Sequence, residues 1–215
     1  MTLWAVLSDV HGRGDRLGRV LADSQALGAA RVLALGDIAS PGAMALLLQA
    51  RATCAFGNWE ASGLRGLPSP YRGWVARWPA LVREDGFLAA HASPVWPQGL
   101  AIGGVVEHLR SRGLHWSHLF PSLQHSEAHR LAALAELESA GVTIFLHGHT
   151  HMQEAWRQSA DGTLEHIPGH AGELTLEPSA RWLVGVGSVG DPHDGPGVCY
   201  ALYDSTERRL TWRRT

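Results

Sequence analysis

The sequence predicts one α/β domain, in which an alternating β-α-β-α-β segment leads into a second half that is rich in short strands. The chain has 215 residues, of which 45% are hydrophobic, and this is enough for one well-buried core. Short apolar runs alternate with helical patterns near its start, whereas its last third consists of strand-like runs separated by turns. No repeat or low-complexity linker divides the sequence, so we expect a single domain over residues 1–215.

The first segment is expected to form three parallel strands covered by two helices. Ser40 is a suitable N-cap for the second helix, and Pro41 suits its first position because the missing N–H is not needed there. The expected strands are Leu3–Leu7, Arg31–Leu35 and Thr53–Phe56, and the expected helices run from about Asp15 to Leu27 and from about Gly42 to Gln49.

A hairpin, an insertion and a long helix are expected next. The turn Glu84-Asp85-Gly86 separates the two hairpin strands, Leu81–Arg83 and Phe87–Ala90. Residues 92 to about 129 are rich in Gly, Pro, Trp and His, and we interpret them as a cap insertion with a short helix near Val105–Arg110. The remaining expected elements are a helix at about Ser126–Ser139 and strands at Val142–Leu146, Glu154–Arg157, Leu164–Ile167, Glu173–Leu176, Arg181–Val186, Val198–Tyr203 and Arg209–Trp212.

Composition excludes several classes of function. The formal net charge is only −2 and no basic run is present, so a long nucleic acid is not an expected partner. No apolar stretch reaches membrane-spanning length, and Leu3–Leu7 is too short for a signal peptide, so we expect a cytoplasmic protein. Cys54 and Cys199 lie in apolar runs typical of buried free thiols. The oligomeric state is open, although the 9 Trp residues permit an interface.

Polar motifs follow five of the expected strands. In open α/β sheets, ligands gather at the loops that follow the carboxyl ends of strands. Asp, Asn and His offer oxygen and imidazole donors that suit Mn, Fe, Zn or Mg, and a central carboxylate such as Asp37 can bridge two such ions. The motifs are Asp9-Val10-His11, Gly36-Asp37, Gly57-Asn58, His91 and Gly148-His149-Thr150-His151.

Each motif is weak by itself, because a single Asp after a strand is usually a turn or cap residue and a single His is usually structural. The ordered set is more specific, and Asn58 is the one asparagine in the chain. In that set the sequence resembles the calcineurin-like metallophosphoesterase superfamily, whose pattern is D-x-H, G-D, G-N-H-[DE], a strand-ending H and G-H-x-H. The ending Gly187-Ser188-Val189-Gly190-Asp191-Pro192-His193-Asp194 is similar to that of a small bacterial and archaeal branch of predicted phosphodiesterases.

The resemblance implies a four-layer sandwich of two mixed β-sheets flanked by helices. It also implies two divalent metal ions, Mn by preference and otherwise Fe, Zn, Ni or Mg. Asp37 would bridge the two ions. The other implied ligands are Asp9, His11 and His151 for the first ion, and Asn58, His91 and His149 for the second.

The departures from the family pattern concern the catalytic groups. Trp59 stands where the family has a histidine that assists the transition state or leaving group, and an indole has no ionisable proton to replace it. Trp59 either stacks on the substrate or packs beneath its loop. Glu60 keeps the acidic position and is expected to orient the loop. His193 replaces an arginine and either supplies a proton or phosphate contact or only packs in its loop.

The function implied is a dinuclear-metal-dependent phosphodiesterase that hydrolyses a small nucleotide-like ester with a metal-bound hydroxide. Its expected catalytic residues are Asp37, Asn58 and His193, and Trp59 and Ser188 are expected substrate contacts. One alternative is a non-catalytic metal-binding scaffold on the same fold, and another is a nucleotide-binding regulator.

Other signals are rejected or left without a function. Residues 185–190 match the dinucleotide pattern G-x-G-x-x-G, but Pro192 and Pro196 exclude the helix that must follow. Ser188 also lacks the nucleophile-elbow pattern. The histidines of the insertion match no zinc spacing, and we interpret them either as incidental surface residues or as part of a cap over the site.

Overall fold

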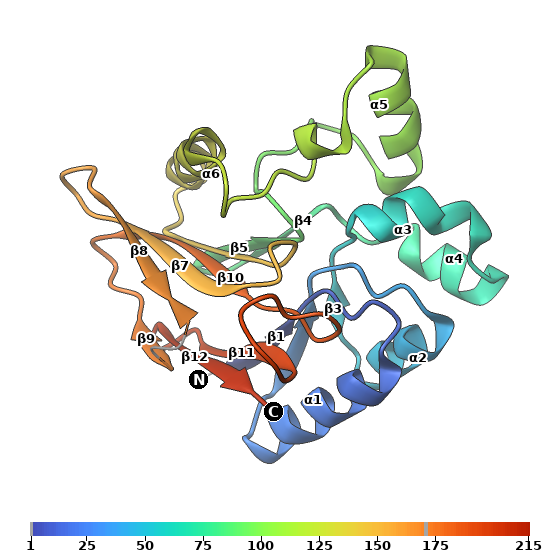
Figure 1. Ribbon diagram of the computed structural model, residues 1–215, viewed down its shortest axis with the longest axis horizontal. Helices are drawn as coiled ribbons and strands as arrows, with labels where there is room; N and C mark the ends of the chain where they lie inside the picture. The colour runs from blue at the N-terminus through green and yellow to red at the C-terminus, as the bar shows by residue number, and fades with distance from the viewer. Residues whose placement is uncertain (1, 170–171) are drawn as a thin grey trace.

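The computed structural model describes residues 2–169 and 172–215. Two six-stranded mixed sheets lie face to face, and helices cover their outer faces (Figure 1). Helices α1 (Gly14–Ala26) and α2 (Pro41–Gln49) cover the first sheet, and α6 (Glu127–Ser139) covers the second. This arrangement confirms the expected sandwich of two mixed sheets flanked by helices.

The first sheet has the order β3-β2-β1-β11-β12-β9. Strands β1, β2 and β3 are parallel, as the alternating first segment predicts, and β11 pairs antiparallel with β1. The sheet therefore joins the start of the chain to its end. Its strands are β1 (Leu3–Leu7), β2 (Arg31–Ala34), β3 (Thr53–Cys54), β9 (Glu173–Thr175), β11 (Cys199–Asp204) and β12 (Arg209–Arg214).

The second sheet has the order β4-β5-β6-β10-β7-β8. Strands β5, β6 and β10 are parallel, while β4, β7 and β8 pair antiparallel with their neighbours. The predicted hairpin around 84–86 is confirmed as β4 and β5. The strands are β4 (Leu81–Glu84), β5 (Phe87–Ala90), β6 (Ile144–His147), β7 (Gln153–Gln158), β8 (Leu164–Pro168) and β10 (Arg181–Val186).

Aromatic side chains fill the space between the two sheets. Phe87 contacts Trp4 and Tyr203 edge to face, with ring centroids 5.6 and 5.4 Å apart. These three residues and Trp182 are all essentially buried. Each large ring removes much apolar surface from water, and edge-to-face contacts add specificity to that burial. The sheets are thereby held in one relative position, which fixes where their strand ends meet.

Two short helices were not predicted from the sequence. Helix α3 (Asn58–Gly63) is separated from the end of β3 by three residues, and α4 (Ser69–Val75) follows a 3₁₀ turn at Leu64–Gly66. Glycine and proline in this stretch conceal the helical pattern, because helices this short carry little periodicity. By contrast, the predicted N-cap of α2 is confirmed, since the Ser40 side chain accepts a hydrogen bond from the backbone N–H of Ala43.

The region expected to be a cap insertion contains α5 (Val105–Arg112) between two 3₁₀ turns. It extends from the side of the molecule that carries α3 and α4 (Figure 1). Its buried residues Ile102, Val105 and Phe120 join the hydrophobic core that includes Phe56. The insertion is therefore packed against the fold. Within residues 2–169 and 172–215, no helix has both the length and the apolar character that crossing a membrane requires.

Candidate metal centre

The seven residues expected to bind metal follow the carboxyl ends of five strands, six of them in loops and Asn58 at the first position of α3. Three of these strands, β1, β2 and β3, belong to the first sheet, and β5 and β6 belong to the second. The site therefore lies where the two sheets meet. It depends on the packing between the sheets as well as on the order of strands within each.

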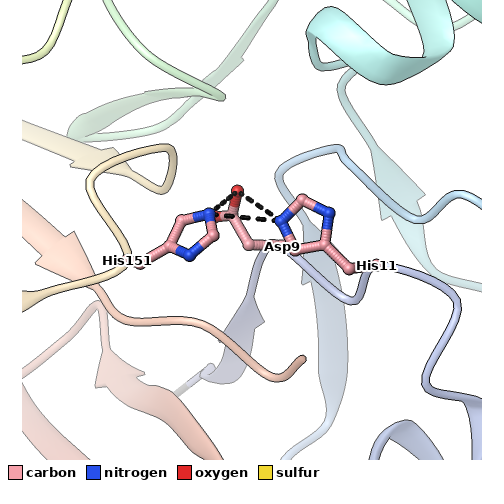
Figure 2. Close-up of side chains that lie close together, drawn as sticks. All are labelled: Asp9, His11 and His151. Carbon is pink, nitrogen blue, oxygen red and sulfur yellow. Dashed lines mark hydrogen bonds and ion pairs between the residues drawn. The ribbon is translucent and has the colours of Figure 1, made fainter. Parts of the chain in front are cut away.

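Asp9, His11 and His151 form the first group of ligand atoms (Figure 2). Asp9 Oδ1 lies 3.3 Å from His151 Nε2 and 3.8 Å from His11 Nε2, and the two imidazole nitrogens are 3.2 Å apart. The side chain of Asp9 is fully buried, and its Oδ1 has no hydrogen-bond partner among the described residues. Its other oxygen, Oδ2, accepts the backbone N–H of His149 at 2.9 Å.

The tautomer of His151 follows from its second nitrogen. Nδ1 of His151 lies 2.6 Å from the backbone oxygen of Asp191, which can only accept a hydrogen bond. Nδ1 therefore carries a proton, and in the neutral imidazole a lone pair on Nε2 points at Asp9. A buried oxygen without a donor and an imidazole lone pair directed at it form an arrangement that a divalent cation would satisfy.

His91 is at the centre of the second group. Its Nε2 lies 3.0 Å from Asn58 Oδ1, 3.2 Å from His149 Nδ1 and 3.5 Å from Asp37 Oδ2. Its Nδ1 lies 2.9 Å from the backbone oxygen of Leu35, so Nδ1 carries a proton, and in the neutral imidazole Nε2 carries a lone pair.

The two groups are neighbours. Asp9, Asp37 and His91 offer ligand atoms that all lie within 4.8 Å of one another. Oxygen and imidazole donors of this kind suit Mn, Fe, Zn or Mg, so the residues present fit two closely spaced divalent ions.

Backbone strain is concentrated in these loops. Eight non-glycine residues in the described ranges have positive φ, and five of them are expected ligands. Left-handed backbone at a non-glycine residue costs free energy, and it persists only where the surrounding structure imposes it. The strained ligands are Asp9 (φ 54°), His11 (47°), Asp37 (56°), His149 (63°) and His151 (59°).

Glu60 holds the loop that carries Asp37. It is buried, and its Oε2 accepts the backbone N–H groups of Asp37 at 2.8 Å and Gly57 at 2.9 Å. Its Oε1 accepts Ile38 N at 2.8 Å and Ala39 N at 3.4 Å. One carboxylate thus joins the loop after β2 to the loop after β3, as expected for a residue that orients the site.

Two glycines allow the ligand loops to approach one another closely. A Cβ on Gly57 would lie 2.1 Å from Asp37 Oδ1. A Cβ on Gly148 would lie 1.9 Å from Ser8 Oγ and 2.5 Å from Asp9 Oδ2. Any side chain at either position would displace a ligand carboxylate or the serine next to it, so Gly-Asn and Gly-His reflect a requirement for space.

Electrostatic interactions within the site alter its protonation. Burial raises the pKa of Asp37 to about 7, against the favourable charge of His91, and Asp9 raises it further. For Asp9, burial acts in the same direction, but His91 and His151 outweigh it and hold the pKa of that carboxyl below its usual range. Burial, together with His91, lowers the pKa of His149 to about 3, so this imidazole is neutral at physiological pH and available as a ligand.

Trp59 lies beside the site, and its side chain is not packed beneath its loop. Its indole is 53% exposed and meets the ring of His11 edge to face, with centroids 5.3 Å apart. Its backbone N–H donates to Asp37 Oδ1 at 2.9 Å. The alternative of a packed indole is therefore wrong, and the side chain is accessible to a ligand.

His193 lies at the rim of the first group of ligands. Its ring is 4.4 Å from that of His151, between centroids, and its side chain is 56% exposed. Its Nε2 is 3.5 Å from Asp191 Oδ2, and its backbone N–H donates to the oxygen of His151 at 3.1 Å. The side chain is thus close to the expected metal ligands and open to solvent.

The prediction that Ser188 contacts substrate is not supported by its position, because the side chain is fully buried. Its hydroxyl donates to the backbone oxygen of Asp9 at 2.9 Å and accepts the backbone N–H of Asp191 at 2.8 Å. These bonds hold the loop after β10 against the loop after β1, so Ser188 supports the backbone of the ligand Asp9. Its burial excludes direct contact with substrate in this conformation.

The insertion contributes one residue that sequence reasoning missed. Phe120 packs against the rings of His91 and His149, at centroid distances of 5.9 and 6.5 Å. No sequence signal distinguishes Phe120 from other apolar residues of the insertion. By contrast, the insertion's histidines at 115, 118, 125 and 129 are exposed, and none of the groups that could hold a metal ion among the described residues includes them.

Comparison with known proteins agrees with the fold. A protein of Methanocaldococcus jannaschii without an assigned function is 24% identical over 221 residues, covering 96% of this chain and 84% of that protein. The crystal structure of a metallophosphoesterase from Sphaerobacter thermophilus has a TM-score of 0.73 at 19% identity, covering 100% of this chain and 88% of that one.

An archaeal phosphodiesterase, described as novel, has a TM-score of 0.55 at 11% identity, with both chains fully covered. At these identities the two solved structures show a shared fold. The model of the family described as "Calcineurin-like phosphoesterase superfamily domain" matches residues 1–208. The chain therefore belongs to the calcineurin-like phosphoesterase superfamily.

Proposed function

We propose that this protein is a dinuclear-metal-dependent phosphodiesterase that acts on a small nucleotide-like ester. The observation that carries the proposal is the convergence of seven potential metal-ligand side chains from five segments, in which imidazole lone pairs and a buried carboxylate oxygen face one another. Buried hydrogen-bond acceptors that face one another without a proton between them are costly unless a cation binds to them.

The ligand sets proposed from the geometry are Asp9, His11 and His151 for one ion and Asn58, His91 and His149 for the other, with Asp37 between them. Two bound divalent ions, Mn by preference, would supply Lewis acidity at the phosphate and lower the pKa of water. The protein itself positions these groups through Glu60, Ser188 and the loops' strained backbone.

A preference for diesters or activated esters follows from the groups around the site. The side chain at position 59 is an indole, which has no ionisable proton to give to a leaving alkoxide. His193 is an exposed titratable side chain whose ring lies 4.4 Å from that of His151, and we propose that it exchanges a proton with the substrate or contacts its phosphate. The insertion is proposed to act as a cap, since Phe120 contacts two proposed ligands.

The test is hydrolysis of bis-p-nitrophenyl phosphate and p-nitrophenyl phosphate by metal-stripped protein reconstituted with Mn. Turnover that favours the diester, requires Mn and is lost in Asp37→Ala supports the proposal. His193→Ala should change the pH profile of that turnover. Leu48→Ala, at an exposed position of α2, is the matched control and should behave like the parent protein.

The presence of Trp59, in place of a histidine with an ionisable proton, also favours the alternative of a non-catalytic scaffold. Binding of two ions without turnover on either ester, with any divalent metal, would indicate the scaffold and exclude the phosphodiesterase. Stabilisation by a nucleotide without its hydrolysis would indicate a regulator.

A further inference from the structure

We infer that the cavity beside Trp59 binds an uncharged aromatic group of the phosphate ester, next to the proposed metal centre. The inference rests on the proposed function and deepens it by naming the chemistry of the substrate's organic part. It is carried by the position of one apolar cavity, by the exposure of Trp59, and by the lack of a free charge in the cavity.

The cavity has a volume of about 360 Å³ and lies between α2, α3 and the start of α4. This volume is within the range of small-molecule sites, which is about 300–1,000 Å³. Most of its lining is apolar, and it includes Ala39, Pro41, Met44, Trp59, Leu67 and Pro68. Helices α2, α3 and α4 lie on the same side of the molecule in Figure 1.

Trp59 joins this cavity to the metal centre. Its indole lines the cavity and meets the ring of His11 at 5.3 Å, while its backbone N–H donates to Asp37 Oδ1 at 2.9 Å. Ala39, another lining residue, is two positions after Asp37. An ester whose phosphate lies at the proposed ligands therefore has its organic group within reach of this wall.

The lining offers no free charge. Glu60 is its one acidic residue among the described positions, and both of its oxygens already accept backbone N–H groups. The described residues that line the cavity include no arginine and no histidine. A sugar or a second phosphate would lose hydration there without gaining a partner, whereas a flat aromatic ring would cover the exposed indole and lose little.

The burial of one ring predicts a measurable affinity difference. Removing one face of an aromatic ring from water and stacking it on an indole increases affinity on the order of tenfold to a hundredfold. We therefore expect phenylphosphonate to bind Mn-loaded protein at least about tenfold more tightly than methylphosphonate, as measured by calorimetry. Both probes carry a P–C bond and are not esters, so the measurement does not depend on turnover.

Two cavity variants test the location. Trp59→Ala removes the stacking surface but keeps the backbone N–H that Asp37 uses. Gly63→Phe adds a side chain at a lining position where a Cβ meets nothing within 4 Å. Each should reduce the phenyl preference to less than about threefold. The matched controls Leu48→Ala and Gly18→Phe, away from the cavity, should retain it.

A second pair of probes identifies the aromatic group. AMP that binds more tightly than ribose 5-phosphate, with the difference lost in Trp59→Ala, supports a nucleobase in the cavity. A phenyl preference without an AMP preference supports a less polar aryl group.

The inference and the proposed function fail separately. Equal affinity for phenyl- and methylphosphonate, or a phenyl preference unchanged in both cavity variants, overturns the inference whether or not esters are hydrolysed. Absence of ester turnover together with a Trp59-dependent phenyl preference overturns the phosphodiesterase and leaves the cavity assignment standing. Circular dichroism and Mn content of each variant establish that it is folded and loaded before its affinities are compared.

Discussion

Replacing Glu60 by glutamine should destabilise the protein far more than this nearly isosteric change suggests. The carboxylate is buried and accepts four backbone N–H groups, two at each oxygen. In Glu60→Gln, one oxygen becomes an NH₂ group that faces two N–H donors and can accept from neither. The less costly orientation places NH₂ at Oε1, where the bonds to Ile38 and Ala39 measure 2.8 and 3.4 Å.

The magnitude follows from those two lost bonds. A hydrogen bond to a charged group is worth about 1.5–3 kcal/mol, and the 3.4 Å contact contributes less than the 2.8 Å one. We therefore expect the free energy of unfolding to fall by about 2–4 kcal/mol. Urea denaturation of the metal-free protein, followed by circular dichroism, measures this change.

The control is Glu107→Gln on α5, whose side chain is 63% exposed and pairs with Arg110 at the surface. The free energy of unfolding should fall by less than about 1 kcal/mol in this control, because exposed ion pairs contribute little to stability. Mn affinity should fall in Glu60→Gln only, since Asp37 is no longer held in its strained conformation. A loss below about 1 kcal/mol with unchanged Mn affinity would refute the role of Glu60 in holding the site.

Three further predictions concern other parts of the structure. Gly148→Ala should lower the free energy of unfolding by about 1–3 kcal/mol or more and weaken Mn binding, because its Cβ would lie 1.9 Å from Ser8 Oγ. In Gly18→Ala the added Cβ meets nothing within 4 Å, so denaturation should show a free energy of unfolding that is higher by about 0.5–1 kcal/mol. Chelation of Mn-loaded protein should lower its melting temperature by about 5–10 °C if the free metal is near 100 times its Kd, and an unchanged melting curve would contradict the proposed centre. Burial, with the hydrogen bond to Asp23, raises the pKa of Tyr200 above its usual value, so folding favours the protonated phenol and stability is lost as pH rises above about 10. The stability difference between the parent protein and Tyr200→Phe should therefore shrink between pH 8 and 11, and a difference independent of pH would exclude this linkage.

Much of the secondary structure could be predicted because its signals are local. The strand Leu3–Leu7 and the hairpin at 81–90 are apolar runs bounded by turn residues, and Ser40-Pro41 mark the start of a helix. Helices α3 and α4 could not be predicted in the same way. Helix α3 depends on Glu60 reaching back to the N–H of Gly57, a contact that does not appear as a periodic pattern.

The sequence by itself determined the identity of the candidate site residues, because each ligand belongs to a short motif at the end of a strand. It also indicated the supporting role of Glu60. Only the tertiary structure decided what each side chain faces. It buried Ser188 against the backbone of Asp9, exposed Trp59 beside His11, and brought Phe120 of the insertion against His149.

The physical reason is sequence distance. His149 and Asp9 are 140 residues apart, and a hydrogen bond between them requires the two sheets to be packed. The same holds for the protonation of the site. The lone pairs on His91 and His151 are directed inward by backbone oxygens of Leu35 and Asp191, which belong to other loops of the folded chain. Local patterns specify which groups are available, and the packing of the two sheets specifies the distances and burial that determine their chemistry.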